Sequence, residues 1–261
     1  MSNATATPES FAGIANEMAD VAGAIVRRYF RTGISVDTKH DQSPVTEADR
    51  AVEAAIRDLI DHNHPDHGIF GEEHGTVRTD AEYVWVIDPI DGTKAFITGI
   101  PLFGTLIALL HRGRPVLGVI DQPVLKERWI GVAGGKTLLN GRPVETRPCE
   151  KLSDAYLFTT TPEMYQGPNV AAFERLKAAV QFARFGGDCY AFGLLASGFI
   201  DVITEASLKP YDYCALVPVV ESAGGVMTDW QGKPLGLHSD GRVIAAGDRR
   251  IHEQALARLA G

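Results

Sequence analysis

Two stretches near the start of the chain repeat their apolar residues at helical spacing. Apolar side chains recur every three or four positions through residues 11–30 and again through residues 47–62. Because this spacing gathers them on one face of a helix, both stretches are predicted to form amphipathic helices. Ser10 is the expected N-cap of the first helix. The polar residues 1–10 are expected to lack regular structure.

Short apolar runs replace the helical spacing in the middle of the chain. They are rich in Val, Ile and Leu and are separated by turn residues such as the Asn140-Gly141 pair. Successive short strands joined by tight turns are typical of a largely antiparallel sheet. The runs that we predict to be strands are residues 68–71, 83–87, 105–110, 116–120 and 129–132.

The second half of the chain alternates apolar runs with helical patterns. This alternation predicts an α/β arrangement. A boundary near Cys149 divides the chain into residues 1–150 and 151–261, which we expect to form one compact catalytic unit. The predicted strands are 155–159, 181–185, 200–205, 226–228 and 243–246, and the predicted helices are 169–179, 188–197, 214–222 and 251–259.

The composition is that of a globular protein. Of the 261 residues, 45% are hydrophobic and 22% are charged, which is too apolar for a disordered chain. No run of about 18 apolar residues is present, and this argues against a membrane span. The formal net charge of −8 argues against nucleic-acid binding, which needs a basic surface. An acidic protein can still hold a phosphorylated substrate through metal ions.

The cysteines and the N-terminus bear on location. Cys149, Cys189 and Cys214 occur without a CxxC or Cys/His grouping. An odd number of scattered cysteines is typical of a reducing compartment and not of a disulfide scaffold or zinc site. The N-terminus lacks the basic and apolar regions of a signal peptide. We therefore expect a cytoplasmic protein.

Acidic residues stand where predicted strands end. Glu72 and Glu73 follow one apolar run, Asp88 follows the next, and Asp91 comes three residues later. Two aspartates and the Ile90 carbonyl, converging at a rigid sheet edge, are oxygen ligands of the kind that Mg²⁺ prefers. The alternative is that Asp-Pro and Asp-Gly only mark turns and that the adjacent glutamates are solvated.

A glycine-containing turn follows these acids. Gly92, Thr93 and Lys94 open a predicted helical turn, whose backbone N–H groups can hold a phosphate, and the Thr93 hydroxyl can orient a water. The GxxxxGK[ST] pattern of nucleotide hydrolases is absent. Far downstream, Asp212 precedes the helix predicted at 214–222. Asp212 is either the N-cap of that helix or a further metal ligand, and spacing alone does not decide between them.

These motifs resemble those of the inositol monophosphatase superfamily, a group of Mg²⁺-dependent phosphomonoesterases. They keep the family's order along nearly the whole chain. Two segments depart from the usual pattern: Tyr211 stands where Trp is common, and residues 186–189 replace a GSAA-like stretch near the substrate. The matching motifs are VTEAD at 45–49, GEE at 71–73, DPIDGT at 88–93, YDYCA at 211–215 and ESAGG at 221–225.

The resemblance implies a layered α/β/α/β/α sandwich that binds two to three Mg²⁺ ions. Asp88 is implied to be shared between two of them. The implied ligands are Glu72, Asp88 and the Ile90 carbonyl for one ion, and Asp88, Asp91 and Asp212 for another.

The resemblance also implies which residues carry the reaction. A third, weaker metal would lie near Glu72, with Asp49 in its outer shell. Asp91, Gly92 and Thr93 would bind the phosphate. Glu72, Thr93 and Asp49 are the implied catalytic residues, because Glu72 and Thr93 would position a water for in-line attack on phosphorus. Family members are commonly homodimers, so a homodimer is expected here.

Within the superfamily, the sequence is most similar to the histidinol-phosphate phosphatase branch. The similarity lies in residues 91–99, 101–109, 184–190 and 205–213. It implies a hydrolase that converts L-histidinol phosphate to L-histidinol and phosphate in histidine biosynthesis.

The substrate of that branch carries an ammonium and an imidazole, so its pocket is expected to hold carboxylates. Asp188 and Glu205 are the candidates. The alternatives are that Asp188 caps the helix it precedes and that Glu205 lies on a solvated loop. Arg184 is a further candidate for substrate binding, and it would contact the phosphate or a partner subunit. Asp212 is the fourth residue that we expect to bind the substrate. A loop carrying Lys39 is a candidate for closing over the site.

Most of the eight histidines lie outside these motifs. His62, His64 and His67 share one predicted turn. A polar surface turn is the favoured interpretation, and a metal site is the alternative.

Other functions use parts of the same pattern. An inositol-1-phosphate or broad-specificity sugar phosphatase would keep the metal motifs unchanged. A 3′-phosphoadenosine phosphatase would need a nucleotide pocket, of which the sequence shows no sign. A non-catalytic family member would be expected to have lost at least one of the motif residues. All of them are present: Glu72, Asp88, Asp91, Thr93 and Asp212.

Overall fold

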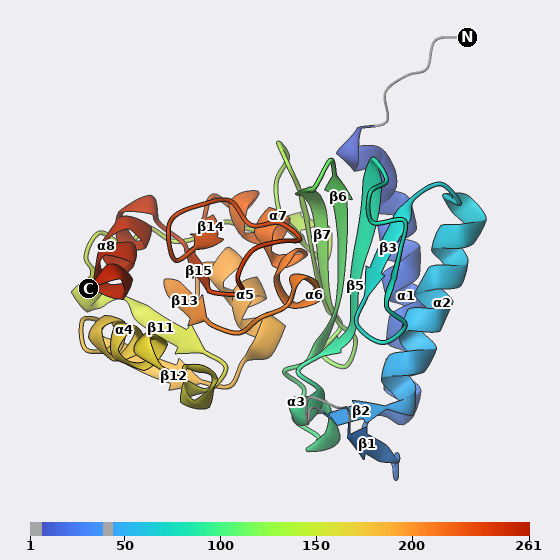
Figure 1. The fold of residues 1–261 in the computed structure, drawn as a ribbon, viewed down its shortest axis with the longest axis horizontal. Helices are drawn as coiled ribbons and strands as arrows, with labels where there is room; N and C mark the ends of the chain where they lie inside the picture. The colour runs from blue at the N-terminus through green and yellow to red at the C-terminus, as the bar shows by residue number, and fades with distance from the viewer. Residues whose placement is uncertain (1–6, 39–43) are drawn as a thin grey trace.

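The computed structural model describes residues 7–38 and 44–261, and these residues stack in five layers (Figure 1). Two long helices cover one face of a large sheet. A second set of helices lies between this sheet and a smaller one, whose outer face is covered by two further helices. The expected α/β/α/β/α sandwich is confirmed.

The outer helix pair consists of α1 (Ala12–Tyr29) and α2 (Glu47–Asn63), as the apolar spacing predicted. The inward face of each helix packs on the large sheet, and Met18 of α1 and Ile56 of α2 are fully buried there. Among the described residues, no helix combines the length and the apolar content that crossing a membrane requires.

The start of α1 differs from the prediction. A 3-10 helix, η1 (Pro8–Phe11), leads directly into α1, so regular structure begins before Ser10. The Ser10 hydroxyl donates to the Thr7 carbonyl at 2.6 Å, and no side chain caps α1. Residues 1–6 of the segment expected to lack structure lie outside the described ranges.

In the described part of the chain, the large sheet has eight strands in the order β10-β9-β8-β7-β6-β5-β3-β4. Neighbouring strands are antiparallel except for β3 and β5, which run parallel. The predicted antiparallel meander is thus confirmed. The strands are β3 (Gly68–Gly71), β4 (Thr76–Val77), β5 (Tyr83–Asp91), β6 (Gly104–His111), β7 (Arg114–Gln122), β8 (Glu127–Val132), β9 (Leu138–Leu139) and β10 (Arg142–Pro143). A separate two-stranded ribbon joins β1 (Val36–Thr38) to β2 (Pro44–Thr46).

The smaller sheet has the strand order β12-β11-β13-β15-β14 among the described residues. The strands β11, β12 and β13 are parallel, whereas β15 pairs antiparallel with both of its neighbours. The strands are β11 (Tyr156–Thr159), β12 (Phe182–Phe185), β13 (Val202–Glu205), β14 (Val226–Asp229) and β15 (Val243–Ala246). The helical segments outside this sheet are η2 (Leu152–Asp154), η3 (Pro162–Met164), α4 (Pro168–Lys177) and α8 (Arg249–Ala260).

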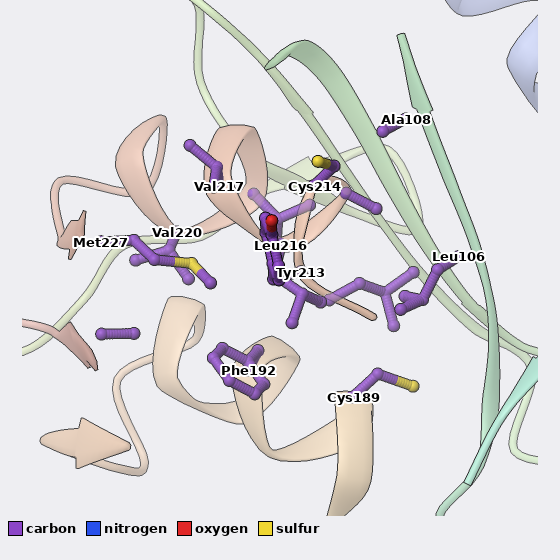
Figure 2. Close-up of a cluster of buried hydrophobic side chains, with 14 of the residues drawn as sticks. Leu106, Ala108, Cys189, Phe192, Tyr213, Cys214, Leu216, Val217, Val220 and Met227 are labelled. Atoms are coloured by element: carbon purple, nitrogen blue, oxygen red, sulfur yellow. The ribbon is translucent and has the colours of Figure 1, made fainter. Parts of the chain in front are cut away.

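The central layer joins the two sheets through apolar packing. It consists of α5 (Asp188–Ala196), α6 (Pro210–Tyr213) and α7 (Leu216–Glu221). In Figure 2, Leu106 of the large sheet lies near Cys189 of α5, while Met227 of the smaller sheet reaches the other side of the same cluster. One apolar core therefore spans both halves of the chain.

Two glycines let the central layer approach the large sheet closely. A Cβ on Gly118 would lie 1.9 Å from the Ala215 carbonyl oxygen, and one on Gly131 would lie 2.3 Å from the Pro218 carbonyl oxygen. A side chain at either position would push α7 away from the sheet. This contact fixes the height of the α6–α7 segment above the sheet.

The helix predicted over residues 214–222 is shorter in the structure, and a separate helix precedes it. α6 ends at Tyr213 and α7 begins at Leu216. Proline is accepted only in the first turn of a helix, and Pro218 therefore requires that α7 start shortly before it. Asp212 precedes α7 as expected, but it lies inside α6 and the N-cap of α7 is Ala215, so the N-cap alternative for Asp212 is wrong.

The turn after α2 packs histidines against aromatic rings. The rings of His64 and His67 stack with centroids 4.5 Å apart, and the Trp85 indole N–H donates to His67 Nδ1 at 3.1 Å. The turn does lie at the surface, where His62 is exposed, but His64 and His67 are half-buried against aromatic rings. Burial, together with the neighbouring His64, lowers the pKa of His67 to about 4.

Acidification is expected to destabilise the fold through His67. Its pKa is about 4 in the folded protein and 6.5 ordinarily, so between these values only the unfolded chain binds the proton. Stability contributed by the neutral ring is therefore lost as the pH falls through this window. The variant His67→Gln should lose less stability than the parent between about pH 7.5 and pH 4.5. Urea unfolding followed by tryptophan fluorescence measures this, and equal losses in both proteins would contradict it.

Candidate metal centre and active site

The end of β5 brings two carboxylates to one side of the large sheet. In a regular strand, residues three apart point to opposite faces. Here the pairing with β6 shifts, because Asp88 lies opposite Leu106 and Asp91 lies opposite Gly104. The extra residue on β5 forms a bulge, and Pro89 occupies it where no ladder N–H is needed. The bulge is what allows Asp88 and Asp91 to share a site.

The third carboxylate comes from the second half of the chain. α6 packs against β5, and the Lys209 backbone N–H donates to the Asp212 carboxylate at 2.6 Å. One oxygen from each of Asp88, Asp91 and Asp212 lies within 4.8 Å of the others. The structure thus brings Asp212 from the second half of the chain next to Asp88 and Asp91 of the first half.

These carboxylates repel one another in a buried setting. Burial raises the pKa of Asp91 to about 7, and the Asp212 charge adds to the shift. Burial likewise raises the pKa of Asp212 to about 7. The pKa of Asp88 is raised well above its ordinary value by burial and by the charges of Glu72 and Asp91. A divalent cation among them would reverse these shifts.

Glu72 and Asp49 border the same group. Glu72 directly follows β3, and its backbone N–H donates to the Ile87 carbonyl at 3.2 Å. Asp49 lies in the first turn of α2, where one of its oxygens accepts the Thr46 N–H at 2.8 Å and the Thr46 hydroxyl at 2.6 Å. Burial raises the pKa of Asp49, and the nearby Glu72 charge adds to the shift.

The donor set fits Mg²⁺. The oxygens Asp88 Oδ1 and Asp49 Oδ1 are buried and have no hydrogen-bond partner among the described residues. Hard divalent cations take oxygen ligands, and Mg²⁺ keeps some of its waters, so such oxygens suit the ion or its hydration shell. The cluster of Asp88, Asp91 and Asp212 contains no thiolate or imidazole of the kind that would favour zinc.

The turn after β5 requires glycine. Gly92 has a φ of +81° and is the N-cap of α3 (Thr93–Ile97). A Cβ at this position would lie 3.0 Å from Asp188 Cγ. Backbone conformation and crowding both exclude a side chain here, so the turn lies in contact with Asp188. The Thr93 hydroxyl donates to the Ile90 carbonyl at 3.1 Å.

Asp91 also contacts the second half of the chain directly. Its Oδ2 accepts the Cys189 backbone N–H at 2.6 Å, at the start of α5. The alternative that Asp188 caps this helix is wrong, because no side-chain cap bond is formed and Asp188 has a φ of +44°. Burial raises the pKa of Asp188 to about 7, with the Asp91 charge adding to it.

Glu205 ends β13 and is only 2% exposed. One of its oxygens accepts the Thr160 N–H at 2.9 Å and the Thr160 hydroxyl at 3.1 Å. Burial raises its pKa to about 8, and the charges of Asp188 and Asp91 add to the shift. The alternative that Glu205 lies on a solvated loop is wrong.

Two of the basic residues that the sequence singled out, Arg184 and Lys94, are exposed. Arg184 is exposed on the edge strand β12 and forms no hydrogen bond or ion pair with the acids of this site in the described chain. Its predicted contact with phosphate or a partner subunit stays a prediction. Lys94 is exposed on α3, where its charge lowers the pKa of Asp188 against the raising effect of burial. Lys39 lies outside the described residues.

A buried acid close to the Glu72 loop escaped the sequence analysis. Glu53 lies on the inward face of α2, beside Val52 and Ile56, with its side chain fully enclosed. A glutamate at an apolar position of an amphipathic helix was the available signal. Its carboxylate accepts backbone N–H groups from the loop that carries Glu72.

Comparisons with known proteins agree along the whole chain. A sequence model described as the inositol monophosphatase family matches residues 7–260. The chloroplastic bifunctional phosphatase IMPL2 of Arabidopsis thaliana is 51% identical over 260 residues, which cover 96% of this chain and 75% of that protein. The histidinol-phosphatase of Mycobacterium tuberculosis is 34% identical over 253 residues, which cover 94% of this chain and 96% of that protein.

A solved structure gives the same fold. The structure of an inositol monophosphatase from Zymomonas mobilis matches with a TM-score of 0.91 and 46% sequence identity. The match covers 98% of this chain and 100% of that one.

Proposed function

The chain belongs to the inositol monophosphatase family of Mg²⁺-dependent phosphatases, and we propose that it hydrolyses L-histidinol phosphate to L-histidinol and phosphate. The observation that carries the proposal is Glu205, an enclosed carboxylate whose pKa is raised by burial and, to a smaller extent, by the charges of Asp188 and Asp91. The similarity of this chain to histidinol-phosphatases supports the same substrate.

The acids at the end of β5 would hold the metal. When bound, Mg²⁺ would activate a water and stabilise the charge that develops on the attacking and leaving oxygens. We assign to one ion Glu72, Asp88 and the Ile90 carbonyl, and to another Asp88, Asp91 and Asp212. The unpaired Asp49 Oδ1 suits a water in the outer shell of this site.

Protein groups would orient the reactants. The Thr93 hydroxyl donates its hydrogen bond to the Ile90 carbonyl, so its oxygen stays available to accept a hydrogen bond from a water. Glu72 would accept one proton from that water as the water oxygen bonds to phosphorus and the ester P–O bond breaks. The N–H groups of Gly92 and Thr93, with Asp91 acting through the metal, would bind the phosphate. A second water would protonate the departing alkoxide.

The substrate's cationic end is assigned to Asp188 and Glu205. Burial raises the pKa of both carboxyls, to about 7 and about 8. An ammonium or imidazolium placed against them would favour their ionised forms and form charge-assisted hydrogen bonds. A neutral polyol such as inositol phosphate would leave the same carboxylates without a cation.

A substrate panel tests the proposal. We expect Mg²⁺-dependent phosphate release from histidinol phosphate at a rate well above that from myo-inositol 1-phosphate, fructose 1,6-bisphosphate and 3′-phosphoadenosine 5′-phosphate. Loss of release with EDTA is the control for metal dependence. Preference for inositol phosphate would keep the metal site and overturn the assignment of Asp188 and Glu205.

Assembly and location stay predictions from the sequence. We propose a homodimer, and the exposed Phe182 and Phe185 on edge strand β12 support contact there because exposed apolar edges favour association. Arg184 lies between them on the same strand.

A further inference from the structure

A buried ion pair on α2 supports the loop that carries Glu72. The Glu53 side chain has no exposed surface, and the Arg57 side chain one turn later is 14% exposed. Arg57 Nε donates to Glu53 Oε1 at 2.8 Å. Enclosing a carboxylate is costly unless its oxygens are fully hydrogen-bonded. The other hydrogen-bond partners of Glu53 therefore show which part of the structure it supports.

Those partners are backbone groups of the loop after β3. Glu53 Oε2 accepts the Glu73 N–H at 2.6 Å, and Glu53 Oε1 accepts the His74 N–H at 3.0 Å. A terminal nitrogen of Arg57 donates to the Gly75 carbonyl. The pair therefore holds three successive residues of the loop, directly after Glu72.

The loop has little freedom to shift around this pair. A Cβ on Gly71 would lie 1.9 Å from Glu53 Oε1, so the carboxylate packs directly on the backbone that precedes Glu72. On the other side, the Glu72 N–H is bonded to the Ile87 carbonyl of β5. Glu72 is thus held between α2 and the strand that carries Asp88.

We propose that Glu53 and Arg57 are positioning residues that set the Mg²⁺ affinity of the site by fixing the loop that carries Glu72. This inference rests on the proposed function, in which Glu72 is a metal ligand. The pair touches neither the group of Asp88, Asp91 and Asp212 nor the substrate candidates. Its effect is therefore on metal binding and not on the choice of substrate.

The variant Glu53→Gln tests this with little change in shape. Its amide has one acceptor oxygen in place of two, so the N–H of Glu73 or that of His74 would face an NH₂ group. We expect the Mg²⁺ dissociation constant, measured by calorimetry, to rise by about 10- to 100-fold. At saturating Mg²⁺, kcat should largely recover. In the metal-free protein, hydrogen exchange of the Glu73 and His74 amides should become faster.

A second variant keeps the test available if the first does not fold. Arg57→Lys retains the charge but cannot donate to Glu53 and the Gly75 carbonyl together in the planar geometry of a guanidinium. It should raise the Mg²⁺ dissociation constant by less than Glu53→Gln does.

The chain offers a matched control in the smaller sheet. Asp201 has no exposed side-chain surface, accepts from Arg147 at 2.8 and 2.6 Å, and accepts the Tyr156 backbone N–H at 2.8 Å. Asp201→Asn weakens the same kind of buried pair away from the metal centre. It should lower the melting temperature and leave the Mg²⁺ dissociation constant within about twofold.

The outcomes separate this inference from the proposed function. Absence of Mg²⁺ binding by the parent protein would overturn both. Parent-like Mg²⁺ affinity in Glu53→Gln would overturn only the positioning role. Equal loss of affinity in Glu53→Gln and Asp201→Asn would also overturn it, because general destabilisation would then account for the change.

Discussion

Replacing Asp91 or Asp212 by asparagine is expected to lower Mg²⁺-dependent phosphate release by more than about 100-fold, beyond the effect typical of outer-shell changes. Each replacement removes one negative charge from a group whose oxygens lie within 4.8 Å of one another. An amide oxygen is a weaker ligand for a hard cation than a carboxylate. The loss should therefore appear in metal binding as well as in turnover.

The same variants should be more stable than the parent when no metal is present. Burial and mutual repulsion raise the pKa of Asp91 and of Asp212, so a neutral side chain removes an unfavourable interaction. Thermal melting with and without Mg²⁺, together with calorimetric titration, measures both effects. Asp121→Asn alters a buried acid near α1 and should leave Mg²⁺ binding unchanged. Near-normal turnover in both Asp91→Asn and Asp212→Asn would contradict the metal assignment.

Replacing Glu205 by glutamine should reduce kcat/KM for histidinol phosphate by about 30-fold or more, because unpairing an enclosed charge costs at least about 2 kcal/mol. Glutamine retains the acceptor for the Thr160 N–H but cannot pair with a substrate cation. Turnover of myo-inositol 1-phosphate, which has no cationic group, should change much less. The ratio of kcat/KM for the two substrates separates the effect of the Glu205 charge from any general loss of folded or active protein.

The matching control is Glu221→Gln at the far end of α7. This glutamate is exposed and lines a surface pocket that contains no residue of β13. Its replacement should leave kcat/KM for both substrates unchanged. If Glu205→Gln slowed both substrates equally, Glu205 would be supporting the fold and not selecting the substrate.

Local sequence patterns predicted most of the helices and strands, because the formation of each element depends mainly on residues close to one another in the sequence. The spacing of apolar positions placed α1 and α2, and turn residues such as Asn140-Gly141 placed the strand ends. The position of acids at strand ends likewise pointed to Asp88 and Asp91. The structure adds the bulge that turns both toward one side, which depends on pairing with β6 and is invisible in β5 alone.

The remaining features depend on contacts between distant parts of the chain. Asp188 looked like a helix cap by its position, yet the cap is supplied by Asp91 from the large sheet. Glu53 had no motif, because its partners are backbone groups that any sequence would offer. The division between α6 and α7 was available from Pro218, whose placement near a helix start is a local rule.

The hydrogen bond from Cys189 to Asp91 has a consequence for how the protein opens. Asp91 belongs to the large sheet, while α5 and Asp212 belong to the second half of the chain. A cation held by these acids therefore acts as a reversible cross-link across the seam between the halves. Mass action would make this cross-link worth about 2.7 kcal/mol at an ion concentration one hundred times its dissociation constant. At low Mg²⁺ concentration, the contact between the two halves would thus be the first to unfold locally, and proteases would cleave there first.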